Sequence, residues 1–63
     1  MLNNFSKLEK IYSWELNFQL SSFWNSGYIA KLGDSINGFT AERQFDNLTD
    51  AIDFLYAEAI KYK

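Results

Sequence analysis

The sequence predicts an α+β fold, in which a three-stranded antiparallel sheet is followed by a C-terminal helix that packs on one face of the sheet. Three observations predict it. Apolar and polar residues alternate over positions 11–20, an Asn-Gly pair lies at 37–38, and the apolar period becomes helical in the last third of the chain. The chain has 63 residues, which predicts a single domain over residues 1–63.

The first strand is expected over about residues 11–20, IYSWELNFQL. Its apolar residues recur at every second position, so they share one face of a half-buried antiparallel strand. Polar residues occupy the positions between them. The predicted core face consists of Tyr12, Trp14, Leu16, Phe18 and Leu20.

The second strand is expected over about 27–33 and the third over about 38–45. Tyr28, Ala30 and Leu32 continue the core face in the second strand, which leaves Ile29 and Lys31 on the outer face. In the third strand, the core face is expected to hold Phe39, Ala41 and Phe45.

The segment SSFWNSG at positions 21–27 places two aromatic residues between the first two strands. Only a loop with an odd number of residues brings the two apolar faces to the same side of the sheet. A loop over 21–23 would pair Leu20 with Trp24, whereas a five-residue loop would keep the same faces with Trp24 inside the loop. In both cases Phe23 lies outside the strand pairing.

The next hairpin is compatible with two loops of even length. A turn at Asn37-Gly38 would pair Ile36 with Phe39, and a longer loop would pair Leu32 with Phe39. Both loops place Arg43 on the apolar face. Its side chain could cover the margin of the sheet and reach Asp34 or a Tyr ring, or it could anchor a partner.

The C-terminal helix is expected over about 49–62, with Thr49 as its N-cap. Acidic residues at its start and lysines at its end complement the helix dipole. Before the first strand, Leu2, Phe5 and Leu8 have a spacing that fits either a short N-terminal helix or a loosely docked tail. The apolar stripe of the C-terminal helix consists of Leu48, Ala51, Ile52, Leu55, Ala59 and Tyr62.

The composition argues against most kinds of catalysis. The chain has neither Cys nor His, so we expect no disulfide, no thiol nucleophile, no cysteine-ligated metal and no imidazole base. Asp46, Asp50 and Asp53 are expected to cap the C-terminal helix and to complement its dipole. The segment 34–38, DSING, lacks the alternating acidic residues of a calcium loop and is expected to be a turn. We therefore predict no enzyme, no metal and no cofactor.

The net charge is −2, and the six Lys and Arg residues are scattered along the sequence. Proteins that bind nucleic acids gain most of their affinity from clustered Lys and Arg. The charge pattern therefore disfavours a nucleic acid as the partner.

No apolar run is long enough to span a membrane, and no signal peptide is evident at the start. We therefore expect an intracellular, cytoplasmic protein that does not bind membranes.

The order of several short segments resembles the plant ethylene-response-factor type DNA-binding domain, in which a Trp-containing strand and a second hairpin precede an F-D-x(3)-[DE]-A segment. The opening of the helix is also similar to that of integrase arm-binding domains and HicB-type antitoxins. The resemblance implies a three-stranded sheet whose outward face reads DNA. This chain lacks the Arg and Lys side chains that such a face requires. The segments are Trp24, Tyr28-Ile29-Ala30, Phe45-Asp46, Asp50-Ala51 and Ala57-Glu58-Ala59.

The leading functional prediction is a small non-catalytic module that binds a protein, as a regulator, an inhibitor or an accessory subunit. Small proteins of phages and other mobile elements that act on host machinery have this profile. A second copy of the chain is a further candidate partner. The alternative is a nucleic-acid-binding module that uses the sheet face or aromatic stacking. The predicted partner-binding residues are Phe23, Trp24, Ile29, Arg43 and Phe54, because aromatic and Arg side chains dominate many interfaces.

Overall fold

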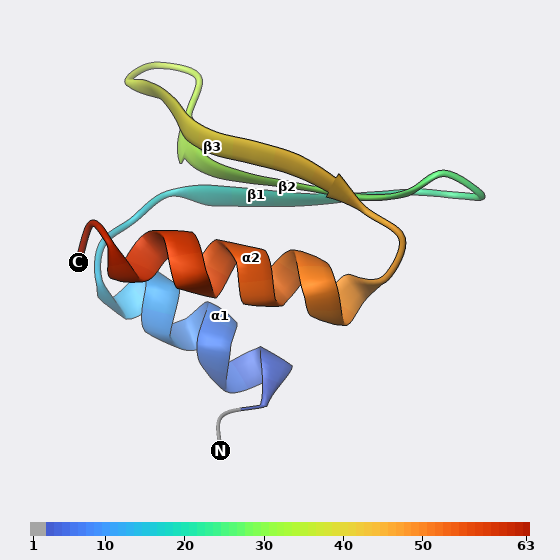
Figure 1. Ribbon diagram of the computed structural model, residues 1–63. Coiled ribbons are helices and arrows are strands. Elements are labelled where there is room, and N and C mark those ends of the chain that lie inside the picture. Colours follow the sequence, from blue (N-terminus) through green and yellow to red (C-terminus); the bar gives the residue numbers. More distant parts are fainter. Residues whose placement is uncertain (1–2) are drawn as a thin grey trace.

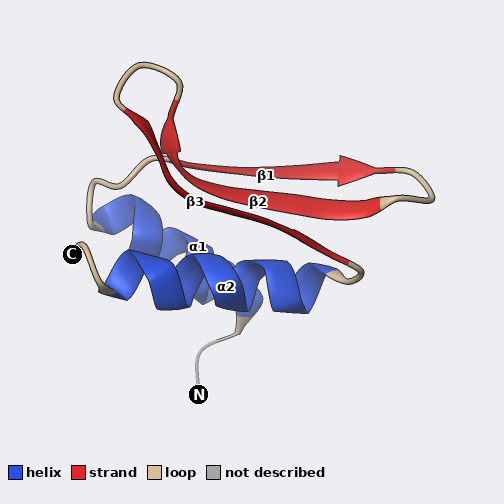
Figure 2. Cartoon of the chain, turned by 45° about the horizontal axis from the view of Figure 1, so that its top comes forward, coloured by secondary structure: helices blue, strands red, loops and turns tan. Residues whose placement is uncertain are grey.

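The computed structural model describes residues 3–63 and confirms the α+β class. Both helices lie on the same side of a three-stranded antiparallel sheet, in which β2 is central and β1 and β3 form the two margins (Figure 1 and Figure 2). Within residues 3–63, neither helix has the length and apolar run that a membrane crossing needs. The elements in chain order are α1 (Asn4–Ser13), β1 (Phe18–Phe23), β2 (Gly27–Asp34), β3 (Gly38–Phe45) and α2 (Leu48–Ile60).

The first strand is shorter than predicted, because the first part of residues 11–20 is helical. Helix α1 starts at the N-cap Asn3, whose side chain accepts a hydrogen bond from the backbone N–H of Ser6 at 2.8 Å. Its residue Ile11 is fully buried, whereas Tyr12, predicted to face the core, is 80% exposed. The N-terminal segment is therefore a helix rather than a tail. Leu2 lies outside the described residues.

Glu15 explains where the helical segment ends. Its backbone has a φ of 61°, in the left-handed region that continues neither a helix nor a strand. The alternating apolar residues Tyr12, Trp14 and Leu16 therefore belong to the end of α1 and the turn after it, and not to a strand. Trp14 caps the C-terminus of the helix, and its ring stacks on Tyr56 of α2 with centroids 5.6 Å apart.

The hairpin between β1 and β2 has an odd-length loop, as the parity of the apolar residues predicts. The loop comprises residues 24–26, so Leu20 pairs with Ala30 and Phe18 pairs with Leu32. Of the two expected loops, the one over 21–23 that pairs Leu20 with Trp24 is wrong, whereas Trp24 lies inside the loop, as the longer alternative predicts. Phe23, predicted to lie outside the pairing, is the last residue of β1 and faces Gly27.

The hairpin between β2 and β3 contains a bulge that neither predicted loop includes. Leu32 pairs with Ala41, but the next residue of β2, Gly33, pairs with Phe39. Thr40 is therefore the extra residue, and its hydroxyl donates to the carbonyl of Leu32 at 3.3 Å. Because one extra residue reverses the side-chain alternation, Phe39 lies on the outer face rather than on the predicted core face.

Helix α2 lies between the sheet and α1, and this position explains its broad apolar surface (Figure 1). It starts at the N-cap Asn47, whose side chain accepts from the N–H of Asp50 at 2.8 Å, so the prediction of Thr49 as the cap is wrong. Side-chain contacts hold its first half to α1. Lys7 forms an ion pair with Asp53, and the Asn4 amide donates to Thr49.

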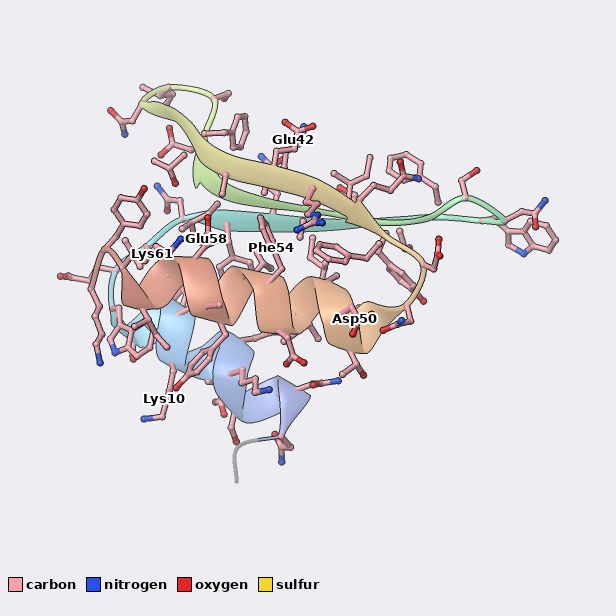
Figure 3. All side chains as sticks on the ribbon, in the orientation of Figure 1. Lys10, Glu42, Asp50, Phe54, Glu58 and Lys61 are labelled. Carbon is pink, nitrogen blue, oxygen red and sulfur yellow. The ribbon has the colours of Figure 1, made fainter. Side chains whose placement is uncertain are left out.

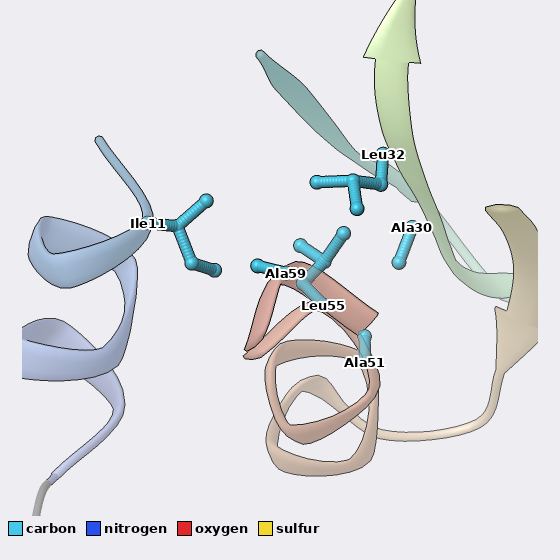
Figure 4. Packing of buried hydrophobic residues seen from close by; sticks show 6 residues of the cluster. All are labelled: Ile11, Ala30, Leu32, Ala51, Leu55 and Ala59. Carbon is cyan, nitrogen blue, oxygen red and sulfur yellow. The ribbon is translucent and has the colours of Figure 1, made fainter. Parts of the chain in front are cut away.

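The main cluster of the hydrophobic core joins all three layers (Figure 4). Leu55 is 0% exposed, and it lies between α1 and the sheet. Half-buried aromatic residues close the margins of the cluster. Its fully enclosed members are Ile11, Ala30, Leu32, Ala51, Leu55 and Ala59.

We expect Leu55→Ala to lower the free energy of unfolding by about 2–5 kcal/mol, because it leaves a cavity between three layers. Urea unfolding followed by far-UV circular dichroism measures this change. The matched control is Ile36→Ala, since Ile36 is 90% exposed on a loop. Its effect should stay within about 0.5 kcal/mol. A loss below about 1 kcal/mol for Leu55→Ala would contradict the three-layer core.

Candidate interaction surface

The face of the sheet that points away from the helices is open, and we call it the outer face. Residues that pair directly across neighbouring strands lie on the same face, so the register defines its members. Figure 3 shows Glu42 on this side of the sheet and Phe54 on the opposite side, between α2 and the sheet. The outer face consists of Gln19, Ser21, Phe23, Ile29, Lys31, Phe39, Glu42 and Gln44.

The apolar part of the outer face lies beside the β1–β2 hairpin. Phe23 is 50% exposed, and Ile29 is half-buried. Gly27, opposite Phe23, has no side chain to cover the ring. The glycine is required there, because its φ is +92° and an added Cβ would lie 2.4 Å from the carbonyl oxygen of Phe45. Because position 27 must be a glycine, no side chain opposite Phe23 covers its ring.

The tip of this hairpin presents Trp24, which is 92% exposed. The loop behind it is held by two hydrogen bonds. The N–H of Ser26 donates to the carbonyl of Phe23 at 2.9 Å, and the side-chain amide of Gln44 donates to the carbonyl of Ser26 at 2.7 Å. Asn25 takes a left-handed backbone with a φ of 64°, which Asn tolerates better than most residues. The turn is thus anchored to β3, while the indole ring projects into solvent.

The opposite end of the outer face carries one charge of each sign. The Lys31 ammonium lies 5.1 Å from the centroid of the Phe39 ring, and Glu42 pairs directly with Lys31 across the strands. The formal charges of the outer face therefore cancel. Phe39 is absent from the predicted site residues, since no local sequence signal indicates the bulge that turns it outward.

Arg43 lies on the side of the sheet that faces the helices, as its parity predicts, because it pairs with Ala30. Its exposed guanidinium lies 5.7 Å from the centroid of the Phe45 ring. Among residues 3–63, it forms neither an ion pair with Asp34 nor a contact with a Tyr ring. Arg43 and Lys31 therefore lie on opposite faces. They do not form the convergent basic surface that phosphate binding needs.

Phe54 is half-buried between α2 and the sheet, although its position in the sequence lies away from the apolar stripe predicted for this helix. Its ring packs on Phe45 with centroids 5.3 Å apart, and it contacts the core cluster. The predicted stripe is too narrow because the sheet covers one side of α2 and α1 covers another. The candidate surface therefore retains Phe23, Trp24 and Ile29, and it excludes Phe54.

A polar cluster joins the β2–β3 loop to the segment before β1. The carboxylate of Asp34 accepts from the backbone N–H groups of Asn37 at 2.6 Å and Ile36 at 2.8 Å, and from the Asn17 amide at 2.6 Å. The hydrogen bond from the Asn37 backbone, followed by that from the Asn17 side chain, lowers the pKa of Asp34 below its ordinary value. The carboxylate is engaged in holding the loop, as expected for a turn.

Within residues 3–63, no group of three His, Cys, Asp or Glu side chains gathers closely enough to hold a metal ion. Comparison of the chain with protein-family models, curated proteins and solved structures finds no match. The candidate surface therefore rests on the structure of this chain alone.

We expect Asp34→Ala to destabilise the protein near neutral pH and to remove part of its acid sensitivity. A carboxyl whose pKa is lowered on folding stabilises the protein above its unfolded value of about 3.9. That stabilisation is lost as the pH falls from there through the lowered pKa of the folded state. Thermal unfolding at a series of pH values measures it. The wild-type and Asp34→Ala midpoints should converge below that range, and a gap independent of pH would contradict the ionic role.

Proposed function

We propose that this chain is a small non-catalytic module that binds a protein through its outer face and hairpin tip. One observation carries the proposal: both helices cover the same side of the sheet, and the uncovered side ends in an anchored turn with exposed aromatic rings. Such a module would act as a regulator, an inhibitor or an accessory subunit of its partner.

The chemistry of the surface indicates the kind of partner. Trp24 and Phe23 offer large apolar areas with few rotatable bonds, which makes aromatic side chains effective at the centre of an interface. The surrounding side chains of Gln19, Ser21 and Gln44 are neutral and offer hydrogen bonds. The partner should therefore present an apolar cleft with a polar, weakly charged rim.

We expect Trp24→Ala and Phe23→Ala each to weaken partner binding at least about tenfold, as loss of an interface anchor does. Trp24→Ala should leave the melting temperature nearly unchanged, because the ring is 92% exposed. A photoreactive phenylalanine analogue at position 24 identifies the partner in lysate of the native host. Titration calorimetry with the purified partner then measures both variants.

The control for this experiment is Ile36→Ala, which removes an equally exposed apolar residue from the other hairpin. It should bind as the wild type does. Wild-type affinity for both hairpin variants would refute the proposed surface. Tight binding of single-stranded DNA that weakens steeply with salt would instead favour the nucleic-acid alternative.

A further inference from the structure

The two margins of the sheet differ in how they are protected against pairing with another strand. Natural proteins protect edge strands with charges, prolines or bulges. Strand β3 has the bulge at Thr40 together with Glu42 and Arg43. Strand β1 has the sequence FQLSSF, with no charge, no proline and a regular register along its whole length. β1 is therefore the unprotected edge.

The register shows which backbone groups of β1 point outward. The N–H of Gly33 donates to the carbonyl of Asn17 at 2.7 Å, so this pair is hydrogen-bonded. Hydrogen-bonded and non-hydrogen-bonded pairs alternate in an antiparallel ladder, so Gln19 and Ser21 bond to β2. The N–H and C=O groups of Phe18, Leu20 and Ser22 then point away from the sheet. Within the described chain, no other segment bonds to these groups.

We propose that β1 is a self-association edge, at which the β1 strands of two copies pair antiparallel about a two-fold axis at Leu20. This inference goes beyond the proposed function and concerns a different surface. In this register, Leu20 pairs with Leu20 of the second copy, and Phe18 pairs with Ser22. All the outward groups of both strands are used, in about six backbone hydrogen bonds. A register shifted by one residue in either copy uses fewer of them.

The side chains also favour a second copy as the occupant. On the outer face, Gln19 would lie opposite Ser21 of the second copy, and no like charges meet anywhere along the strand. The equivalent pairing of β3 about Glu42 would place two carboxylates opposite each other, which is unfavourable. Because a two-fold axis closes the contact, β1 pairing yields a dimer rather than a filament.

The first test measures the mass of the purified chain by sedimentation equilibrium over a wide range of concentrations. The expected result is a monomer–dimer equilibrium. Hydrogen exchange then identifies the edge: the amides of Leu20 and Ser22 should gain protection as concentration rises, whereas those of Gln19 and Ser21 should be protected throughout. A monomer up to the concentrations of an NMR sample would overturn the proposal.

Two double variants test the register. Gln19→Glu with Ser21→Glu places like charges opposite each other twice and should weaken the dimer at least about tenfold. Gln19→Glu with Ser21→Lys places opposite charges there and should retain the dimer. Both introduce the same carboxylate beside Lys31, so they are matched in their effect on the fold. Equal dimerisation of the two variants would overturn this register.

A matched pair of proline variants tests which edge is used. Ser22→Pro removes an outward N–H of β1, and Glu42→Pro removes an outward N–H of β3, so neither breaks a hydrogen bond to β2. Circular dichroism checks that each variant is folded. Ser22→Pro should weaken the dimer at least about tenfold, whereas Glu42→Pro should leave it unchanged. The reverse result would assign the contact to β3 and overturn the proposal.

Discussion

The burial of α2 on two sides is the constraint on which the rest of the structure depends. Leu55 and its neighbours contact α1 on one side and the sheet on another, so both helices must lie on the same side of the sheet. A chain of 63 residues has few side chains with which to form a core, and concentrating them in one cluster is the efficient solution. The consequence is an outer face that no part of the described chain covers.

The sequence predicts the fold well where the apolar period reflects burial on one side only. Strand β2 and its core residues Ala30 and Leu32 follow the alternation closely. The prediction fails at residues 11–14, where the end of a helix with one buried residue, Ile11, imitates alternation. It also fails at Thr40, because a bulge is selected by the geometry of strand pairing and leaves no periodic signal.

The candidate surface is likewise predictable from the sequence in some of its features and not in others. Parity identifies the odd-length loop and places Ile29 on the outer face, but it cannot fix how far β1 extends, so Phe23 lies on the strand rather than beyond it. The sequence predicts one apolar stripe, whereas α2 is covered from two directions, and Phe54 is therefore half-buried against Phe45. Predicting it would require knowing that residues 4–13 form a second helix.

The outer face and the β1 edge offer different contacts, and geometry makes them compatible. A contact on the face approaches along the normal to the sheet, whereas strand pairing extends the sheet within its own plane. The two-fold axis of a β1 pairing is perpendicular to the sheet, because Gln19 and Ser21 of both copies must share one face. The outer faces of two copies would then join into one surface, with a Trp24 tip at each end. Such a dimer would carry the surface twice, and a partner that presents two matching sites would bind it with a higher apparent affinity without any new contact.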